Sequence, residues 1–207
     1  MIKYVIFDFD GTLVDSKDVF ISVFNQLAEN HKFNKIEPEN VETLRRSSMM
    51  ERCKALNFPL YKLPFFAGEA YLLYKNSSSS LILFEGIKEL LDELKHRGFK
   101  IAVISSNSEY NIREFMKKSQ IDYIKDIFCS NNIFGKDKII RYFLKVRKLK
   151  KSEVIYVGDE LRDIVGCRKA GIKVIWVGWG YDVIDMARRE NPDYIVDTPA
   201  QILDIVE

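Results

Sequence analysis

Two acidic residues, Asp8 and Asp10, follow a short apolar run near the start of the chain, and Gly11 comes directly after them. If the run is a strand, side chains two residues apart point the same way, so both carboxylates face one crevice. Two carboxylates beside each other at a buried strand end are costly unless a cation or a proton offsets them. The spacing therefore predicts acid–base or metal-assisted chemistry, against the alternative of a glycine turn with solvated acids.

Other polar residues follow later apolar runs in the same way. Ser105, Ser106 and Asn107 come after one of them, where a hydroxyl and backbone N–H groups could bind an oxyanion. Asp159 and Asp163 come after another. Taken alone, each has an ordinary interpretation, as loop serines, a turn aspartate or a charge near the start of a helix.

The elements that must position these residues are short strands. Apolar runs rich in β-branched residues predict strands over 2–7, 100–104, 127–129, 154–157, 174–177 and 194–196. Segments with helical periodicity lie between them, which predicts an α/β fold, a doubly wound parallel sheet with helices on both sides. Ligands of such sheets bind at the carboxyl ends of the strands, which is where the polar residues stand.

One region breaks this alternation. Residues 16–81 show helical patterns and no strand, which predicts an all-helical domain inserted into a core formed by residues 1–15 and 82–207. The serine tract at 77–80 is typical of a linker. Within the insertion, 44–49 is expected to form a loop facing the core site. Its Arg45 and Arg46 are candidates to bind an anionic leaving group, because guanidinium groups suit carboxylate and phosphate oxygens, unless they are surface helix charges.

The segment Asp8 to Ser16, DFDGTLVDS, resembles the first motif of the haloacid dehalogenase superfamily, DxDGTLxDS. The resemblance extends over essentially the whole chain, with three further motifs in order. It implies that Asp8 is a nucleophile, that Asp10 is a general acid and base, and that the helical insertion is a C1-type cap. It also implies a set of phosphate-binding residues, namely Gly11, Thr12, Ser105, Ser106, Asn107 and Lys136.

The last two motifs complete the catalytic and metal sets that the resemblance implies. Lys136 resembles the motif lysine, but the sequence lacks both prolines of the common KPxP form, so Lys138 stays an alternative. The segment from Gly158 to Asp163 resembles GDxxxD. The implied catalytic residues are Asp8, Asp10, Ser105 and Lys136. The implied Mg²⁺ ligands are Asp8, Asp10 through its carbonyl, Asp159 and Asp163, with Asp163 in an outer position.

The resulting prediction is a phosphoglycolate phosphatase-like, Mg²⁺-dependent phosphatase that hydrolyses a small phosphorylated metabolite through an aspartyl-phosphate on Asp8. A sugar phosphomutase with the same two aspartates is the nearest alternative. A phospho-acceptor signalling module, a non-catalytic phospho-ligand-binding protein and a dehalogenase are less favoured, because all motif positions hold competent residues and Asp10 is the acid that a phosphatase needs.

Composition limits the remaining possibilities. The 207 residues are 47% hydrophobic and carry a formal net charge of +2, a balance that argues against nucleic acid as the partner. Three widely spaced cysteines indicate neither a disulfide framework nor a zinc site. The apolar run at the N-terminus is too short for a signal peptide, and no stretch is long enough for a membrane span, so a cytoplasmic monomer or homodimer is expected.

Overall fold

Six parallel strands form the central sheet of the computed structural model, which describes residues 1–130 and 135–207. The strands are β1 (Tyr4–Phe7), β4 (Lys100–Ser105), β5 (Asp126–Cys129), β6 (Val154–Gly158), β7 (Lys173–Val177) and β8 (Tyr194–Val196). Their spatial order is β5-β4-β1-β6-β7-β8, so the chain builds outward on one side of β1 and then on the other. This reversal beside β1 creates the crevice in which ligands of such sheets bind, and the predicted fold class is confirmed.

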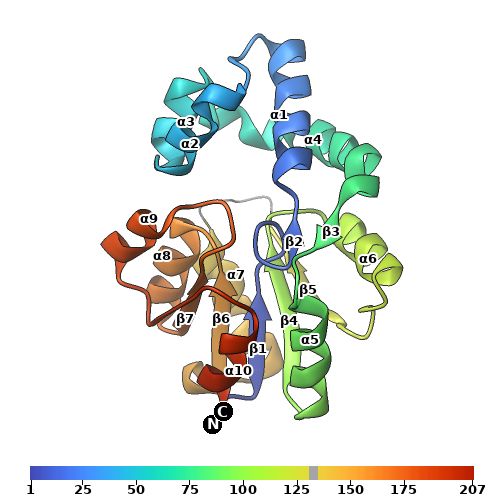
Figure 1. Cartoon of the computed structure of the whole chain (residues 1–207), viewed down its shortest axis with the longest axis vertical. Coiled ribbons are helices and arrows are strands. Elements are labelled where there is room, and N and C mark those ends of the chain that lie inside the picture. The colour runs from blue at the N-terminus through green and yellow to red at the C-terminus, as the bar shows by residue number, and fades with distance from the viewer. Residues whose placement is uncertain (131–134) are drawn as a thin grey trace.

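Helices cover both faces of the sheet (Figure 1). One face carries α5 (Ile87–His96), α6 (Glu109–Lys118) and α10 (Ala200–Val206), and the other carries α7 (Lys136–Arg147), α8 (Leu161–Ala170) and α9 (Ile184–Glu190). Strand β1 contributes side chains to the apolar clusters on both faces of the sheet. Val5 and Phe7 belong to one cluster, whereas Tyr4 and Ile6 belong to the other. Burial on both faces explains why the strands appear in the sequence as continuous apolar runs.

A group of helices stands above the carboxyl ends of the strands (Figure 1). It contains α1 (Lys17–His31), α2 (Pro38–Arg45), α3 (Met49–Ala55) and α4 (Leu63–Ser77), with 3₁₀ turns at Leu60–Lys62 and Ser78–Ser80. The serine tract forms the last residue of α4 and a 3₁₀ turn that leads toward β3, and its interpretation as a linker stays a prediction. The chain leaves and re-enters the core through two short antiparallel strands, β2 (Val14–Asp15) and β3 (Ile82–Leu83). We place the proposed boundary between core and cap at this pair.

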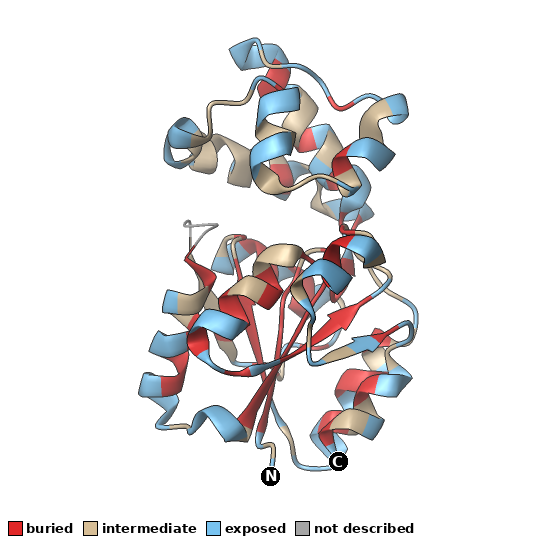
Figure 2. Ribbon diagram, turned by 90° about the vertical axis from the view of Figure 1, so that its left-hand side faces the viewer, coloured by how far each residue is buried: buried red, intermediate tan, exposed pale blue. Residues whose placement is uncertain are grey.

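The cap packs less tightly than the core. Its own apolar cluster has only three buried members, Ile36, Leu44 and Leu56, and α3 buries none of its residues. Figure 2 shows the same contrast, with buried residues dense along the strands below and sparse in the helices above. Many apolar side chains of the cap are therefore only partly covered by their own neighbours.

The cysteines form no disulfide bonds with one another. Cys53, Cys129 and Cys167 are all free thiols. Among the described residues, no helix combines the length and the hydrophobicity that crossing a membrane requires.

Candidate active site

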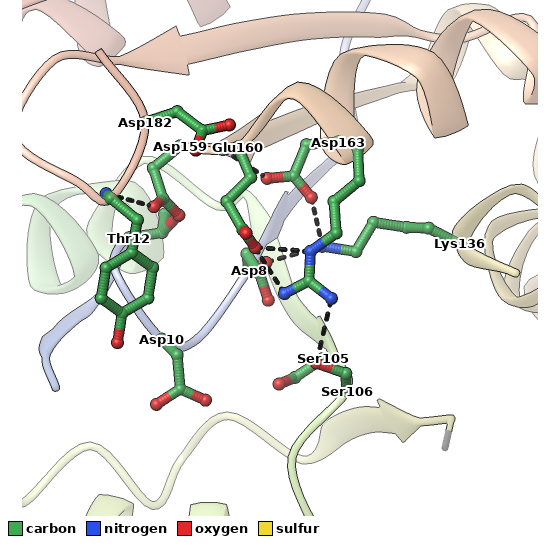
Figure 3. A network of polar contacts seen from close by, with 12 residues as sticks. Asp8, Asp10, Thr12, Ser105, Ser106, Lys136, Asp159, Glu160, Asp163 and Asp182 are labelled. Atoms are coloured by element: carbon green, nitrogen blue, oxygen red, sulfur yellow. Dashed lines mark hydrogen bonds and ion pairs between the residues drawn. The ribbon is translucent and has the colours of Figure 1, made fainter. Parts of the chain in front are cut away.

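The carboxyl ends of three adjacent strands bring the predicted residues together (Figure 3). Asp8 follows β1, Ser105 ends β4, and Asp159 follows β6. Gly11 allows this convergence, because its φ is +77° and a Cβ there would lie 2.3 Å from Oδ2 of Asp159. Both the backbone turn and the close approach of the acid therefore require glycine at this position.

A buried lysine joins two of the acids. Nζ of Lys136, the first residue of α7, donates to Oδ2 of Asp8 at 2.6 Å and also contacts Oδ1 of Asp163. Burial by itself would lower the pKa of Lys136, but the carboxylates of Asp163 and Asp8 outweigh burial and raise that pKa. The lysine therefore stays charged beside Asp8. Lys138 is exposed on the same helix, so the geometry favours Lys136 of the two candidates.

Asp10 has a different environment from Asp8. Its Oδ1 accepts a hydrogen bond from the Tyr74 hydroxyl at 2.6 Å, and its Oδ2 accepts one from Nδ2 of Asn107 at 2.9 Å. Burial raises the pKa of Asp10, in spite of these hydrogen bonds to its charged form. A carboxyl group with a raised pKa is suited to carry and donate a proton.

Asp159 is fully buried, with both carboxylate oxygens hydrogen-bonded. Oδ1 accepts from the Thr12 hydroxyl at 2.7 Å, and Oδ2 accepts from the backbone N–H of Tyr181 at 2.8 Å. Burial, together with the charges of Glu160, Asp163 and Asp8, raises the pKa of Asp159 well above its usual range. The Thr12 side chain therefore orients Asp159 in this structure.

A further acid that sequence reasoning missed lies in the same loop. Carboxylate oxygens of Asp8, Glu160 and Asp163 lie within 4.8 Å of one another, and all three residues are buried. Glu160 occupies a variable position of the GDxxxD motif, so only the presence of a third acid could have indicated it. Its carboxylate also pairs with the guanidinium group of Arg162.

The acidic group has the properties of a cation site. The carboxylates of Asp8, Glu160 and Asp163 lie around two positive side chains, Lys136 and Arg162, and the buried carboxylate of Asp159 adds a fourth negative charge close to these acids. Burial raises the pKa of Asp163 to about 6, even though Lys136 lies beside it. Burial is the main cause of the raised pKa values of Asp159 and Asp163, and the neighbouring carboxylates add to it, so a cation among these acids would stabilise their charged forms. Clustered carboxylate oxygens are the ligands that Mg²⁺ prefers, so the residues fit this ion.

The predicted phosphate-binding residues lie on the β4 side of the site. Ser105 is buried, and its Oγ accepts a hydrogen bond from the backbone N–H of Asn107 at 3.0 Å. Ser106 follows it, and its hydroxyl accepts a long hydrogen bond of 3.4 Å from Nη1 of Arg162. Together with Lys136 these groups surround the side of the crevice that faces Asp8 (Figure 3).

The two cap arginines lie at the end of α2 and in the short loop that follows it. Leu44 and Arg45 are the last residues of α2 and not part of a loop, so that part of the expectation was wrong. Arg45 donates from Nε to the carbonyl of Tyr181 at 2.9 Å and from Nη2 to that of Gly180 at 3.2 Å. Arg46 lies 3.2 Å from Asp185 on α9. Both arginines connect the cap to the segment after β7.

A cavity of about 320 Å³ opens beside the acids and extends into the cap. On the core side it is lined by Asp10, Ser106, Asn107 and Arg162, and Arg45 lines it from the cap. Arg46 does not line it. The site therefore has a polar floor on the sheet and a separate chamber above it.

The chain is similar in sequence to proteins named as phosphatases and similar in fold to solved structures. The phosphoglycolate phosphatase of Synechococcus elongatus is 26% identical over 203 residues, 98% of this chain and 96% of its own length. The pyrophosphatase PpaX of Halalkalibacterium halodurans is 25% identical and covers 99% of this chain and 97% of its own. Among solved structures, the haloacid dehalogenase-like family protein SP0104 of Streptococcus pneumoniae superposes with a TM-score of 0.80 at 21% identity, covering 100% of this chain and 99% of that one.

The sequence profile described as haloacid dehalogenase-like hydrolase matches residues 5–177, from β1 to the end of β7. The match contains all the candidate acids, Lys136 and the whole cap. The chain is therefore a member of the haloacid dehalogenase-like hydrolase family.

Proposed function

We propose that this hydrolase is a phosphatase that cleaves a small phosphorylated metabolite through a covalent intermediate on Asp8. The observation that carries the proposal is the contrast between two carboxyl groups on one strand end. Asp8 is ion-paired with Lys136 at 2.6 Å, whereas burial raises the pKa of Asp10. Environments that separate two carboxyl groups in this way suit one as a nucleophile and the other as an acid.

The residues support a two-step reaction. Asp8 attacks phosphorus, the bond from phosphorus to the leaving oxygen breaks, and Asp10 gives its proton to that oxygen. Asp10 then removes a proton from the water that attacks the aspartyl-phosphate, and cleavage of the bond from phosphorus to Asp8 releases inorganic phosphate. Lys136, Ser105 and the backbone N–H groups of Ser106 and Asn107 are proposed to bind the phosphoryl oxygens.

Mg²⁺ is proposed as the cofactor. Asp8, the backbone carbonyl of Asp10 and Asp159 would hold it, with Asp163 beside them. When bound, the ion would offset the repulsion between the acidic group and an anionic phosphoryl group. The excess of buried carboxylates over cations supports this assignment.

The relatives support the reaction class. Two of them are named a phosphoglycolate phosphatase and a pyrophosphatase, and both span nearly the whole chain. The cap is proposed to close over the site and exclude water, and Arg45 stays in the proposed substrate-binding set because it lines the cavity.

Phosphate release from a panel of phosphorylated metabolites, with Mg²⁺ present, tests the function. We expect release of inorganic phosphate, whereas a phosphomutase would return an isomer of a sugar phosphate instead. Acid quenching during turnover should trap phosphate on Asp8, which mass spectrometry of the digested protein locates. Asp8→Asn should retain the fold and lose turnover, and substantial activity in this variant would overturn the mechanism.

A further inference from the structure

The cavity begins at the residue that would protonate the leaving group. Asp10 lines it, whereas Asp8 does not. If Asp10 is the general acid, as the proposed function requires, the leaving oxygen must lie against Asp10. The rest of the leaving group then extends from Asp10 into the cap. The cap end of this cavity, which we call the cap chamber, therefore selects the substrate.

The wall of the cap chamber is mostly apolar, with aliphatic side chains and a series of aromatic rings. Its main contributors are Phe20, Phe24, Phe58, Leu63, Phe66 and Met49, from α1, α3, α4 and the segment between α3 and α4. The rings form a continuous series, with centroids 6.4 Å apart between Phe20 and Phe24, 5.9 Å between Phe24 and Phe58, and 5.9 Å between Phe58 and Phe66. Such a wall gains free energy when it covers apolar surface and offers little to an anion.

The three arginines of the wall are already engaged. Arg45 donates to two backbone carbonyls and pairs with Glu42. Arg52 donates to the carbonyl of Leu44 and pairs with the carboxylate of Asp182. Arg162 pairs with Glu160 on the core side. A second anionic group in the chamber would have to displace one of these contacts or pair with Lys17, an exposed side chain whose charge solvent screens.

The volume of the cavity indicates how large the apolar group can be. An engineered apolar cavity of about 150 Å³ holds benzene in another protein. The cavity of about 320 Å³ is roughly twice as large, enough for a phosphoryl-bearing carbon and a six-membered ring or a six-carbon chain. We propose that the substrate is a phosphomonoester of an alcohol bearing an aromatic or aliphatic group of this size. This inference rests on the proposed function, and it differs from the glycolate and phosphate leaving groups that the names of the two relatives imply.

A homologous series of esters tests the inference. Ethyl, butyl and hexyl phosphate have leaving alcohols of nearly equal basicity, so their reactivity differs little apart from binding. The value of kcat/KM should rise about threefold with each methylene group that the chamber buries, and hexyl phosphate should exceed 2-phosphoglycolate by at least about tenfold. A flat series, or faster hydrolysis of 2-phosphoglycolate than of hexyl phosphate, would overturn the inference and leave the phosphatase proposal standing.

Measurements of phosphonate binding distinguish the proposal of an apolar cap chamber from the proposal of phosphatase activity. Hexylphosphonate and ethylphosphonate have no hydrolysable ester bond, and calorimetry in the presence of Mg²⁺ measures their affinities directly. Hexylphosphonate should bind at least about tenfold more tightly than ethylphosphonate. Equal affinities would reject the apolar chamber whether or not any ester is hydrolysed. Tight hexylphosphonate binding without hydrolysis of any ester would support the chamber and reject the phosphatase proposal.

Two matched variants localise the effect. Ala67 lines the chamber, whereas Gly68 beside it on α4 is exposed, with open space where a Cβ would project. Ala67→Phe should lower kcat/KM for hexyl phosphate about tenfold and leave ethyl phosphate within twofold. Gly68→Phe should leave both substrates unchanged. If the folded Ala67→Phe protein hydrolyses both esters as well as wild type does, the assignment of the cap chamber as the binding site of the leaving group is overturned. If Ala67→Phe does not fold, Ala70→Leu fills the same wall with a smaller side chain.

Discussion

The hydroxyl of Tyr74, near the end of the cap helix α4, donates a hydrogen bond of 2.6 Å to Oδ1 of Asp10 at the end of the first core strand. Burial, followed by the negative charge of Asp10, raises the pKa of Tyr74, so the tyrosine stays protonated and remains a donor. The cap therefore does more than cover the core, because its Tyr74 hydroxyl fixes the position of Asp10, which we propose as the general acid.

Tyr74→Phe tests this positioning. Without its hydrogen bond the Asp10 carboxyl group keeps only its hydrogen bonds with Asn107 and Ser16 among the described side chains, and we expect kcat for an alkyl phosphate to fall about fivefold to tenfold. Hydrolysis of p-nitrophenyl phosphate should change less than twofold, because its leaving group needs little protonation. Tyr61→Phe, at an exposed cap position, is the control. Equal losses on the two esters would contradict a role through Asp10.

Lys136→Met should lower kcat by at least about a hundredfold, since a positioned cation at a reacting phosphoryl group contributes several kcal/mol. The apolar chain of methionine fills the buried space and leaves out the charge between Asp8 and Asp163. Lys138→Met, at an exposed site on the same first turn of α7, should stay within twofold of wild type. Steady-state kinetics on one substrate, with thermal melting to verify folding, measures both. The opposite ranking would assign the motif lysine to Lys138.

Much of the core could be predicted because its signals are local. Strands buried on both faces appear as short β-branched runs, and Asp8, Ser105 and Asp159 each follow such a run directly. Strand ends in a parallel sheet meet at one edge, so the spacing of these residues along the chain was enough to place them together.

The remaining features depend on contacts between distant segments. Strands β2 and β3 have two residues each, too few for any periodicity to show. Tyr74 joins the site only through the folded arrangement of α4, whereas Glu160 stands next to Asp159 but occupies a variable position of the motif that gives it no signal of its own. The cap helix α2 includes Leu44 and Arg45 because its end is set by packing on Ile36 and Leu56, which no short pattern encodes.

Metal removal gives a prediction about the acidic group. Chelation should abolish turnover, Mg²⁺ should restore it, and Ca²⁺ should inhibit, because Ca²⁺ prefers longer bonds and more ligands. Asp159→Asn should raise the half-saturating Mg²⁺ concentration at least about tenfold and remove the rise in Tm that Mg²⁺ produces in wild type. Glu160→Gln should have a smaller effect, since the Glu160 carboxylate already pairs with Arg162. A larger effect from Glu160→Gln would make Glu160 the ligand.

The two cap arginines should differ in their importance, although they are neighbours. Arg45 lines the cavity and donates to the carbonyls of Tyr181 and Gly180, in the segment whose backbone also holds Asp159. Arg45→Ala removes these contacts, so we expect about a tenfold higher KM for a substrate that fills the cap chamber, through poorer closure of the cap. A small activated substrate such as acetyl phosphate, an acyl phosphate, should be little affected, because it needs only the core residues.

Arg46→Ala should change the KM of neither substrate more than twofold, since Arg46 is 55% exposed and exposed ion pairs contribute little. Equal loss on both substrates in Arg45→Ala would indicate damage to the segment that holds Asp159, and a larger effect from Arg46→Ala would contradict the role in cap closure that we give to Arg45.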